Sequence, residues 1–195
     1  MTEPTLFPEA PAAASAAGAA PRPAVVGLDL SITAPGIAYR DGSTHTVVTR
    51  QKDGDGRLAV IEEAVQIAVG GEQYGLGPLP DLVVMEDIPQ NSHAAKPIAM
   101  VHGVVRNLLR KEGVPYALVT PATLKAYATG KGSGDKVPMA LSAYKRAGRE
   151  FADDNQCDAA WLRWAGLDWL GFPEFDVPAA WRERLNKVSW PEVKR

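Results

Sequence analysis

Short apolar runs alternate with segments of helical periodicity along most of this chain. Residues 25–32 and 82–85 are almost entirely apolar, as expected for strands that are buried on both faces. Residues 58–68, between these runs, carry apolar side chains at a spacing of three and four, which predicts a helix with one buried face. The pattern therefore indicates a domain that mixes strands and helices.

The predicted elements follow one another in the order β-β-β-α-β-α-β-α. Helical crossovers join parallel strands, so the first, fourth and fifth strands should be parallel, with the first beside the fourth. Tight turns should add the second and third strands as an antiparallel meander. The sequence thus predicts an α/β fold with a mixed five-stranded sheet flanked by helices. The predicted strands are residues 25–32, 36–40, 44–49, 82–85 and 116–120, and the predicted helices are residues 58–68, 97–108, 121–125, 137–149 and 155–169.

Composition divides the chain of 195 residues into three parts. Residues 1–23 are rich in Ala and Pro and have few large apolar groups, so we expect a disordered tail. Residues 24–168 contain all the predicted strands and should form the main domain. Residues 169–195 hold several aromatic side chains among prolines and match no motif, so we expect an appendage that packs on that domain.

Acidic residues interrupt the two apolar runs. Asp29 lies inside the first run and Glu86 directly follows the second. A carboxylate in a buried strand is costly unless a cation or a hydrogen bond offsets its charge. For each acid alone, a solvated strand end or a local turn is the alternative. Both lie near the carboxyl ends of strands predicted to be neighbours, where α/β sheets commonly bind ligands.

A third acidic cluster opens the last predicted helix. Asp154 and Asp158 lie four residues apart and share a helix face, and Asn155 lies three residues before Asp158. Helix capping is the alternative, since acids at a helix start also favour the macrodipole. Two strand acids and one helix acid together predict a carboxylate site for Mg²⁺ or Mn²⁺.

Charge is distributed unevenly along the chain. Residues 96–150 contain ten basic and three acidic residues, a net charge of +7, whereas the whole chain carries −2. A basic third beside an acidic site is typical of a surface that binds a polyanion such as nucleic acid. Solvated helix faces rich in Lys and Arg are the alternative.

The remaining composition bears on location. Cys157 is the single cysteine and has no internal disulfide partner, which favours a reducing, cytoplasmic setting. No apolar run approaches the roughly 20 residues of a membrane span, and the N-terminus lacks a basic signal-peptide region.

Four segments together resemble a known family. Residues 27–38 are similar to the opening strand and hairpin of RuvC-like Holliday junction resolvases, and residues 84–88 resemble their second acidic strand. Residues 122–136 resemble the family's lysine-bearing segment, and residues 154–160 its final acidic helix, as in its phage or actinobacterial type. The four segments occur in the family's order and span about residues 24–167.

This resemblance implies an RNase H-like fold, a homodimer and Mg²⁺-dependent cleavage of branched DNA, with two ions in the site. Asp29, Glu86 and Asp158 match the family's metal-binding acids. The fourth position is Asn155, where many relatives have an acid or histidine, so Asp154 or Asn155 remains open as the fourth ligand. The matched lysines that would approach the scissile phosphate are Lys125 and Lys136.

Three functions remain open at this point. The first is a metal-dependent endonuclease that resolves four-way DNA junctions, and the second is a nuclease of the same fold acting on RNA or flap DNA. The third is a module that binds junctions without cutting them, if Asn155 reflects a degraded site. For each, the expected nucleic-acid contacts are Lys96, Arg106, Lys125, Lys131 and Lys136, with His93 near the entrance of the site.

Overall fold

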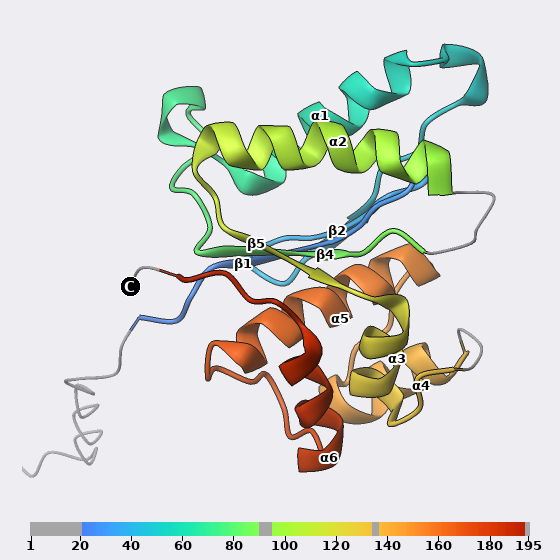
Figure 1. Ribbon diagram of the computed structural model, residues 1–195, viewed down its shortest axis with the longest axis vertical. Coiled ribbons are helices and arrows are strands. Elements are labelled where there is room, and N and C mark those ends of the chain that lie inside the picture. Colours follow the sequence, from blue (N-terminus) through green and yellow to red (C-terminus); the bar gives the residue numbers. More distant parts are fainter. Residues whose placement is uncertain (1–20, 90–94, 134–136, 194–195) are drawn as a thin grey trace, which may run out of the picture.

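The computed structural model of this chain describes residues 21–89, 95–133 and 137–193. Within these residues, two layers of helices enclose a central sheet (Figure 1), which has five strands in the order β3-β2-β1-β4-β5. Residues 1–20 of the predicted tail lie outside the described part of the chain. The strands are β1 (Val25–Asp29), β2 (Gly36–Ala38), β3 (Thr44–Thr46), β4 (Leu82–Glu86) and β5 (Tyr116–Val119).

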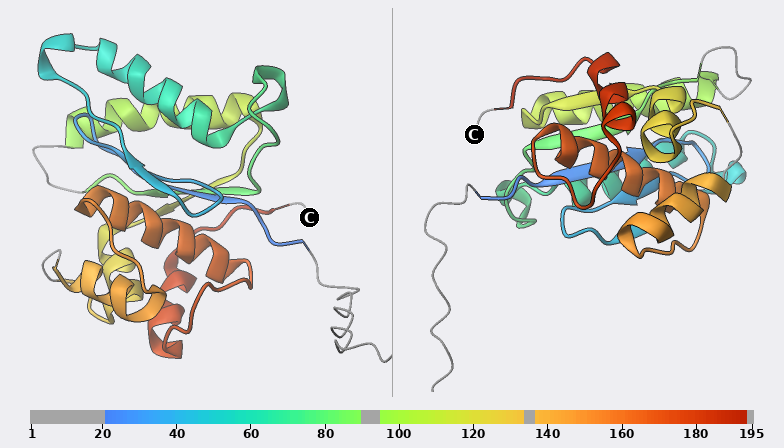
Figure 2. Two further views of the ribbon diagram at one scale, coloured as in Figure 1. Left: turned by 180° about the vertical axis from the view of Figure 1, so that it is seen from behind. Right: turned by 90° about the horizontal axis from the view of Figure 1, so that it is seen from below.

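The helices divide unequally between the two faces of the sheet. α1 (Gly56–Val69) and α2 (Ala95–Glu112) cover one face, and α5 (Asp154–Trp169) lies across the other, as the two views of Figure 2 also show. The face with α5 also carries α3 (Pro121–Thr129), α4 (Val137–Ala147) and α6 (Ala179–Arg182). The described 3₁₀ turns are η1 (Gln51–Asp53), η2 (Glu72–Tyr74) and η3 (Glu183–Lys187).

Strand pairing confirms the predicted topology. β1 pairs in parallel with β4, and β4 pairs in parallel with β5. β2 pairs antiparallel with both β1 and β3, which extends the sheet on one side only. The mixed five-stranded α/β fold that the sequence predicted is therefore correct.

Several predicted element ends are wrong. β1 ends at Asp29 instead of residue 32, because the chain turns there and the Ser31 hydroxyl accepts a hydrogen bond from the Ala34 amide at 3.0 Å. β2 ends at Ala38, where the amide of Tyr39 donates to the Ser43 carbonyl and begins a tight turn. α1 and α2 each begin two residues earlier than predicted.

Strand alternation gives each face of the sheet its own core. Val25, Leu82 and Val84 pack with α5, whereas Val26 and Leu28 pack with α1 and α2. The side of α5 that faces the sheet and α3 is fully packed, and these residues of it are buried: Cys157, Ala160, Trp161, Trp164 and Ala165. No helix in the described ranges is both long and apolar enough to cross a membrane.

Aromatic side chains join the last part of the chain to the α5 core. Trp161 packs edge to face against Tyr127 of α3 at a centroid distance of 5.8 Å and against Phe175 at 5.6 Å. Such pairs contribute about 0.5–1.5 kcal/mol each beyond the apolar area they bury. Residues 170–193, which we call the C-terminal appendage, therefore belong to the same core as α3 and α5.

Candidate active site

Asp29 and Glu86 end neighbouring parallel strands. Leu28 of β1 lies opposite Met85 of β4, so the next pair in this register is Asp29 and Glu86. Side chains alternate along a strand, and both acids share the face of Val25 and the other residues that pack on α5. The two carboxylates predicted from the sequence thus lie side by side, below the α5 layer at the carboxyl end of the sheet.

Two glycines bring α5 onto the ends of these strands. A Cβ atom added at Gly27 would lie 2.1 Å from the Ala159 carbonyl oxygen, and one at Gly36 would lie 2.0 Å from the Asn155 carbonyl oxygen. No side chain fits at such distances, so the helix backbone rests directly on β1 and β2. The sequence prediction missed this contact, although a glycine inside a predicted strand is a known signal of close approach.

The electrostatics of Glu86 show that α5 delivers its acid to the strand ends. Burial, together with the negative charges of Asp29 and Asp158, raises the pKa of Glu86 to about 8. Lys125 acts in the opposite direction and lowers it. Three acids and one lysine predicted from distant parts of the sequence therefore converge here.

Lys125 reaches the site because α3 starts directly after β5. Val119 at the end of β5 lies opposite Glu86, and Thr120 then caps α3 by accepting a hydrogen bond from the Thr123 amide. Pro121 occupies the first turn, where its missing N–H costs nothing. Lys125 lies one turn further along α3, which is why its charge acts on Glu86.

Asp154 and Asn155, the two candidates for the fourth ligand, lie in different surroundings at the start of α5. Asp153 is the helix cap, and its carboxylate accepts hydrogen bonds from the Gln156 amide and the Thr46 hydroxyl. Asp154 is exposed in the first turn, and Asn155 is half-buried. Burial, and then the charges of Asp158 and Asp154, raise the pKa of Cys157 to about 12. The charges that shift the pKa of Glu86 include Asp158 but not Asp154.

Asp87 follows Glu86 directly, so strand alternation directs it to the opposite face of the sheet, which α2 covers. Its charge acts on His102 of α2, whose pKa is nevertheless lowered, because burial is the larger influence. His102 is only 2% exposed. Asp87 also adds to the negative charge that raises the pKa of Glu86, but as the smallest of the contributions.

The predicted nucleic-acid contacts are dispersed. Lys96 is exposed in the first turn of α2, and Lys131 is exposed just after α3. Arg106 lies ten residues after Lys96, where its Nε donates to the Tyr116 hydroxyl at the start of β5. Arg106 is thus directed toward the end of the sheet opposite the acids. His93 and Lys136 lie outside the described residues.

The donors at this site suit a hard divalent cation. Carboxylate oxygens are the ligands that Mg²⁺ and Mn²⁺ prefer, and a cation would relieve the repulsion that raises the pKa of Glu86. In the described part of the chain, no three His, Cys, Asp or Glu side chains already form a complete metal site. The acids are therefore grouped on one side of the sheet but not drawn together into a closed coordination shell.

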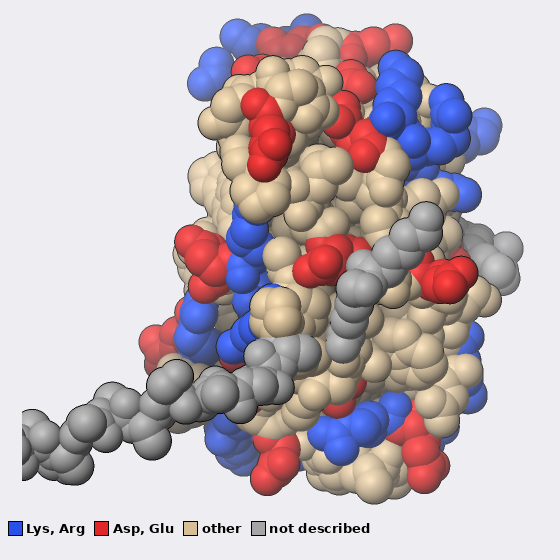
Figure 3. Space-filling model, turned by 90° about the vertical axis from the view of Figure 1, so that its left-hand side faces the viewer, with Lys and Arg blue, Asp and Glu red and all other residues tan. Residues whose placement is uncertain are grey.

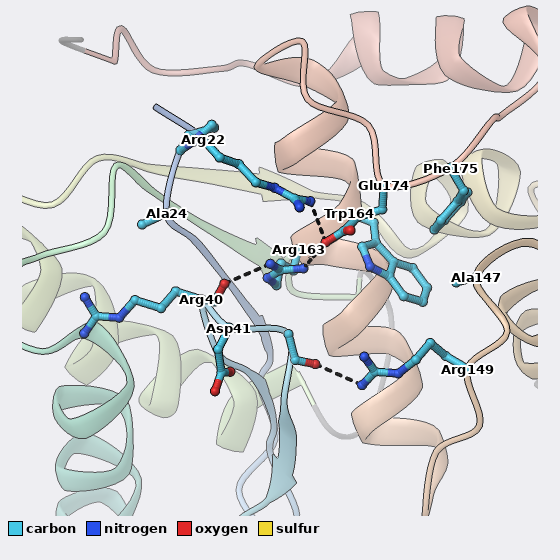
Figure 4. Close-up of a pocket in the computed structure, with 12 residues that line it drawn as sticks. Arg22, Ala24, Arg40, Asp41, Ala147, Arg149, Arg163, Trp164, Glu174 and Phe175 are labelled. Carbon is cyan, nitrogen blue, oxygen red and sulfur yellow. Dashed lines mark hydrogen bonds and ion pairs between the residues drawn. The ribbon is translucent and has the colours of Figure 1, made fainter. Parts of the chain in front are cut away.

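A different cavity, of about 480 Å³, lies where β1 begins (Figure 4). Arg22 and Arg163 both form ion pairs with Glu174, at 2.7 and 2.8 Å, and Arg149 donates to the Gly42 carbonyl at 3.0 Å. Figure 3 faces this side of the molecule, where Lys and Arg are interspersed with Asp and Glu. The arginines of this cavity have protein partners, so their charges fasten the C-terminal appendage to the β2–β3 hairpin.

Comparison with known proteins identifies the fold. No family model and no curated protein matches this chain. Among solved structures, it is similar to RuvC of Thermus thermophilus, with a TM-score of 0.59 and 20% identity over 79% of this chain and 99% of RuvC. The same RuvC in complex with a Holliday junction substrate gives a TM-score of 0.57 and 18% identity over the same shares of the two chains.

A third similar structure is the yeast mitochondrial Holliday junction resolvase Ydc2, with a TM-score of 0.42 and 15% identity over 85% of this chain and 83% of that one. At the identity of the RuvC match, the likeness establishes the architecture: this chain has the RNase H-like fold of RuvC. The fold that the sequence resemblance implied is confirmed.

Proposed function

We propose that this protein is a metal-dependent endonuclease that resolves four-way DNA junctions. The observation that carries this proposal is the placement of Asp29 and Glu86 at the ends of neighbouring parallel strands, on the face that α5 covers with Asp158; the raised pKa of Glu86, caused by burial and by the charges of Asp29 and Asp158, supports it. Three neighbouring carboxylates lower the stability of a folded protein, and replacing them with uncharged residues would raise it. Their presence therefore favours a functional role. The RNase H-like fold of RuvC, and the Holliday junction bound to that RuvC, support a nucleic-acid substrate.

The proposed chemistry is hydrolysis of a phosphodiester. Asp29, Glu86 and Asp158 would hold one or two Mg²⁺ or Mn²⁺ ions, with Asp154 or Asn155 as a fourth donor. Bound ions would supply activation of a water molecule and stabilisation of the leaving oxygen. Lys125 would offset the negative charge that develops on the phosphate, and Lys136 has the same proposed role from the sequence resemblance.

The proposed substrate and assembly follow from the geometry of resolution. The resemblance to RuvC-like resolvases implies a homodimer, and we propose one here because two symmetric cuts resolve a four-way junction and two chains would supply two clusters of acids. Lys96 and Lys131 are exposed and would contact the phosphate backbone, which gives affinity without sequence information.

The decisive experiment is a nuclease assay on a labelled four-way junction, beside linear duplex, flap DNA and an RNA–DNA hybrid. Each substrate is incubated with Mg²⁺, Mn²⁺ or EDTA, using the wild type, Asp29→Asn and a control, Asp55→Asn. Asp55 is an exposed acid before α1 whose side chain makes no capping hydrogen bond. We expect paired nicks in the junction that disappear with EDTA and with Asp29→Asn but persist in Asp55→Asn.

The outcomes separate the alternatives. Cleavage of flap DNA or of the hybrid alone would keep the site but replace the proposed substrate. Tight junction binding without cleavage under either metal would favour a non-cleaving module. A molar mass of one chain for the active protein, measured by light scattering, would contradict the proposed homodimer.

A further inference from the structure

The C-terminal appendage makes a buried polar contact with the two helices that carry Asp158 and Lys125. Asp168, near the end of α5, is only 2% exposed at its side chain. Arg182 of α6 pairs with its carboxylate at 2.7 Å, and the hydroxyl of Tyr127 in α3 donates to it at 3.0 Å. One carboxylate therefore joins α5, α3 and the appendage.

The protonation of the three partners supports this contact. Burial, and then the charge of Asp168, raises the pKa of Tyr127 well above its ordinary value, so the phenol keeps its proton and donates. The hydrogen bond to Asp168 raises the pKa of Arg182, which stays charged. Removing Arg182 alone would leave a buried carboxylate with only a neutral donor.

A second contact of the appendage lies next to the lysine-bearing segment. Gly130, which ends α3 in the left-handed region at a φ of 81°, has no room for a side chain, because a Cβ there would lie 2.5 Å from Trp181. The guanidinium carbon of Arg146 in α4 lies 4.4 Å from the Trp181 ring centroid. Trp181 thus touches both helices that flank residues 131–136.

α3 is a short helix whose position depends on packing, to which the contacts of the appendage add. It has nine residues, and isolated helices of fewer than about 12 residues are marginal in water. Lys125 and Tyr127 lie two residues apart, so their side chains leave the helix on different sides. The side of Tyr127 is held by the appendage, and the other side presents Lys125 toward Glu86.

We propose that Arg182 is a positioning residue of the active site: by holding Asp168 and Tyr127, it fixes the place of Lys125. This inference rests on the proposed function of Lys125 in cleavage. The appendage is therefore part of the catalytic apparatus, although none of its residues needs to touch DNA.

The test compares Arg182→Leu with Arg182→Lys, which keeps the charge, and with the control Arg184→Leu, an exposed residue two positions away. In single-turnover cleavage of a junction, we expect Arg182→Leu to be roughly 10- to 100-fold slower, the loss typical of a small misplacement. We expect junction affinity to change less than about threefold. Arg182→Lys should recover most of the rate, and Arg184→Leu should retain it.

A double-mutant cycle with Lys125→Ala distinguishes positioning from general damage. If Arg182 acts through Lys125, Arg182→Leu should slow the Lys125→Ala protein less than about twofold, because coupled residues are not additive. Equal losses in the two backgrounds would overturn the proposal. So would an unchanged rate in Arg182→Leu.

Hydrogen exchange supplies a measurement that does not require cleavage. We expect Arg182→Leu to increase exchange in residues 121–129 while β1 and β4 keep their protection. If Arg182→Leu alone does not fold, the variant with both Asp168→Asn and Arg182→Leu takes its place, because it removes the buried charge along with its partner. We expect the same increase in exchange in this double variant. Unchanged exchange in α3 would overturn the positioning role, whereas a wild type inactive on every substrate would refute the proposed function alone.

Discussion

The two ends of the sheet hold clusters of charge that are built on opposite principles. At the carboxyl end, burial and the like charges of Asp29 and Asp158 raise the pKa of Glu86 to about 8. At the amino end, burial works to raise the pKa of Glu174, but hydrogen bonds from Arg22 and Arg163 outweigh it and the pKa is lowered. β1 begins near the arginine cluster and ends at Asp29, so it runs from one cluster toward the other.

The difference separates structural charge from functional charge. A carboxylate that lies between two arginines is stabilised by the protein itself and holds segments together. A carboxylate crowded by two others costs folding free energy, and a divalent cation would offset that cost. The arginines that line the cavity at the amino end therefore hold the appendage in place, and the acidic cluster at the carboxyl end is the candidate active site.

The same Glu→Gln substitution should strongly lower the cleavage rate at the carboxyl end of the sheet and leave it nearly unchanged at the amino end. We expect Glu86→Gln to slow junction cleavage roughly 1,000-fold or more, as for loss of a group that acts in the transition state. Glu174→Gln should leave the rate within about threefold. Single-turnover cleavage at saturating protein measures both, and comparable losses in the two variants would contradict the assignment.

A substitution of the lysine beside the acids should have the next largest effect. Lys125→Ala should lower the cleavage rate roughly 100-fold while junction affinity changes little, because its charge is needed where charge develops on the phosphate. Lys52→Ala, in the exposed turn η1, is the matched control. Proportional losses of rate and affinity in Lys125→Ala would instead make Lys125 a contact to the DNA backbone.

At the amino end, the expected effect is on stability. Glu174→Gln removes the partner of Arg163, whose side chain is 6% exposed. We expect the free energy of unfolding to fall by about 2 kcal/mol, less than for a fully buried pair, because Glu174 is partly exposed. Urea unfolding of Glu174→Gln beside Asp55→Asn measures this, and an unchanged midpoint would show that the cluster does not fasten the appendage.

The sequence alone was sufficient to predict that Asp29 and Glu86 lie close together, but not to predict the structure around them. Asp29 and Glu86 were predictable because an acid in an apolar run is a local signal, and the β-α-β order fixed the two strands as neighbours. The turn at Ser31, which ends β1 early, depends on one side-chain hydrogen bond that competes with strand pairing.

Contacts between distant segments were beyond the local pattern. The pairing of Asp168 with Arg182 depends on how residues 170–181 turn back under α5, which no periodicity encodes. Gly27 and Gly36 were seen only as parts of strands, although their missing side chains decide how close α5 lies. The grouping of Asp29 and Glu86 was therefore predictable from the sequence, whereas the packing of α5 and the appendage around them was not.

The smallest expected effect is the pH dependence of stability without metal. In EDTA, the folded protein keeps the proton of Glu86 up to about pH 8, whereas the unfolded chain loses it near the ordinary value of 4.5. The folded state therefore binds more protons between these limits, and stability falls as the pH rises through this window. Glu86 is only half-buried, so solvent lessens this loss, and we expect it to be on the order of 1–2 kcal/mol relative to Glu86→Gln.

Urea unfolding of the wild type and Glu86→Gln at intervals from pH 5 to pH 8 measures this difference. The wild type should be the less stable of the two at pH 8, and the two should converge toward pH 5. Millimolar Mg²⁺ should restore the wild type at pH 8 and leave Glu86→Gln nearly unchanged, because binding to the folded state alone adds to stability. If the stability of the two proteins without metal depended on pH in the same way, burial and the neighbouring acids would not raise the pKa of Glu86. The contrast between the two ends of the sheet would then be wrong.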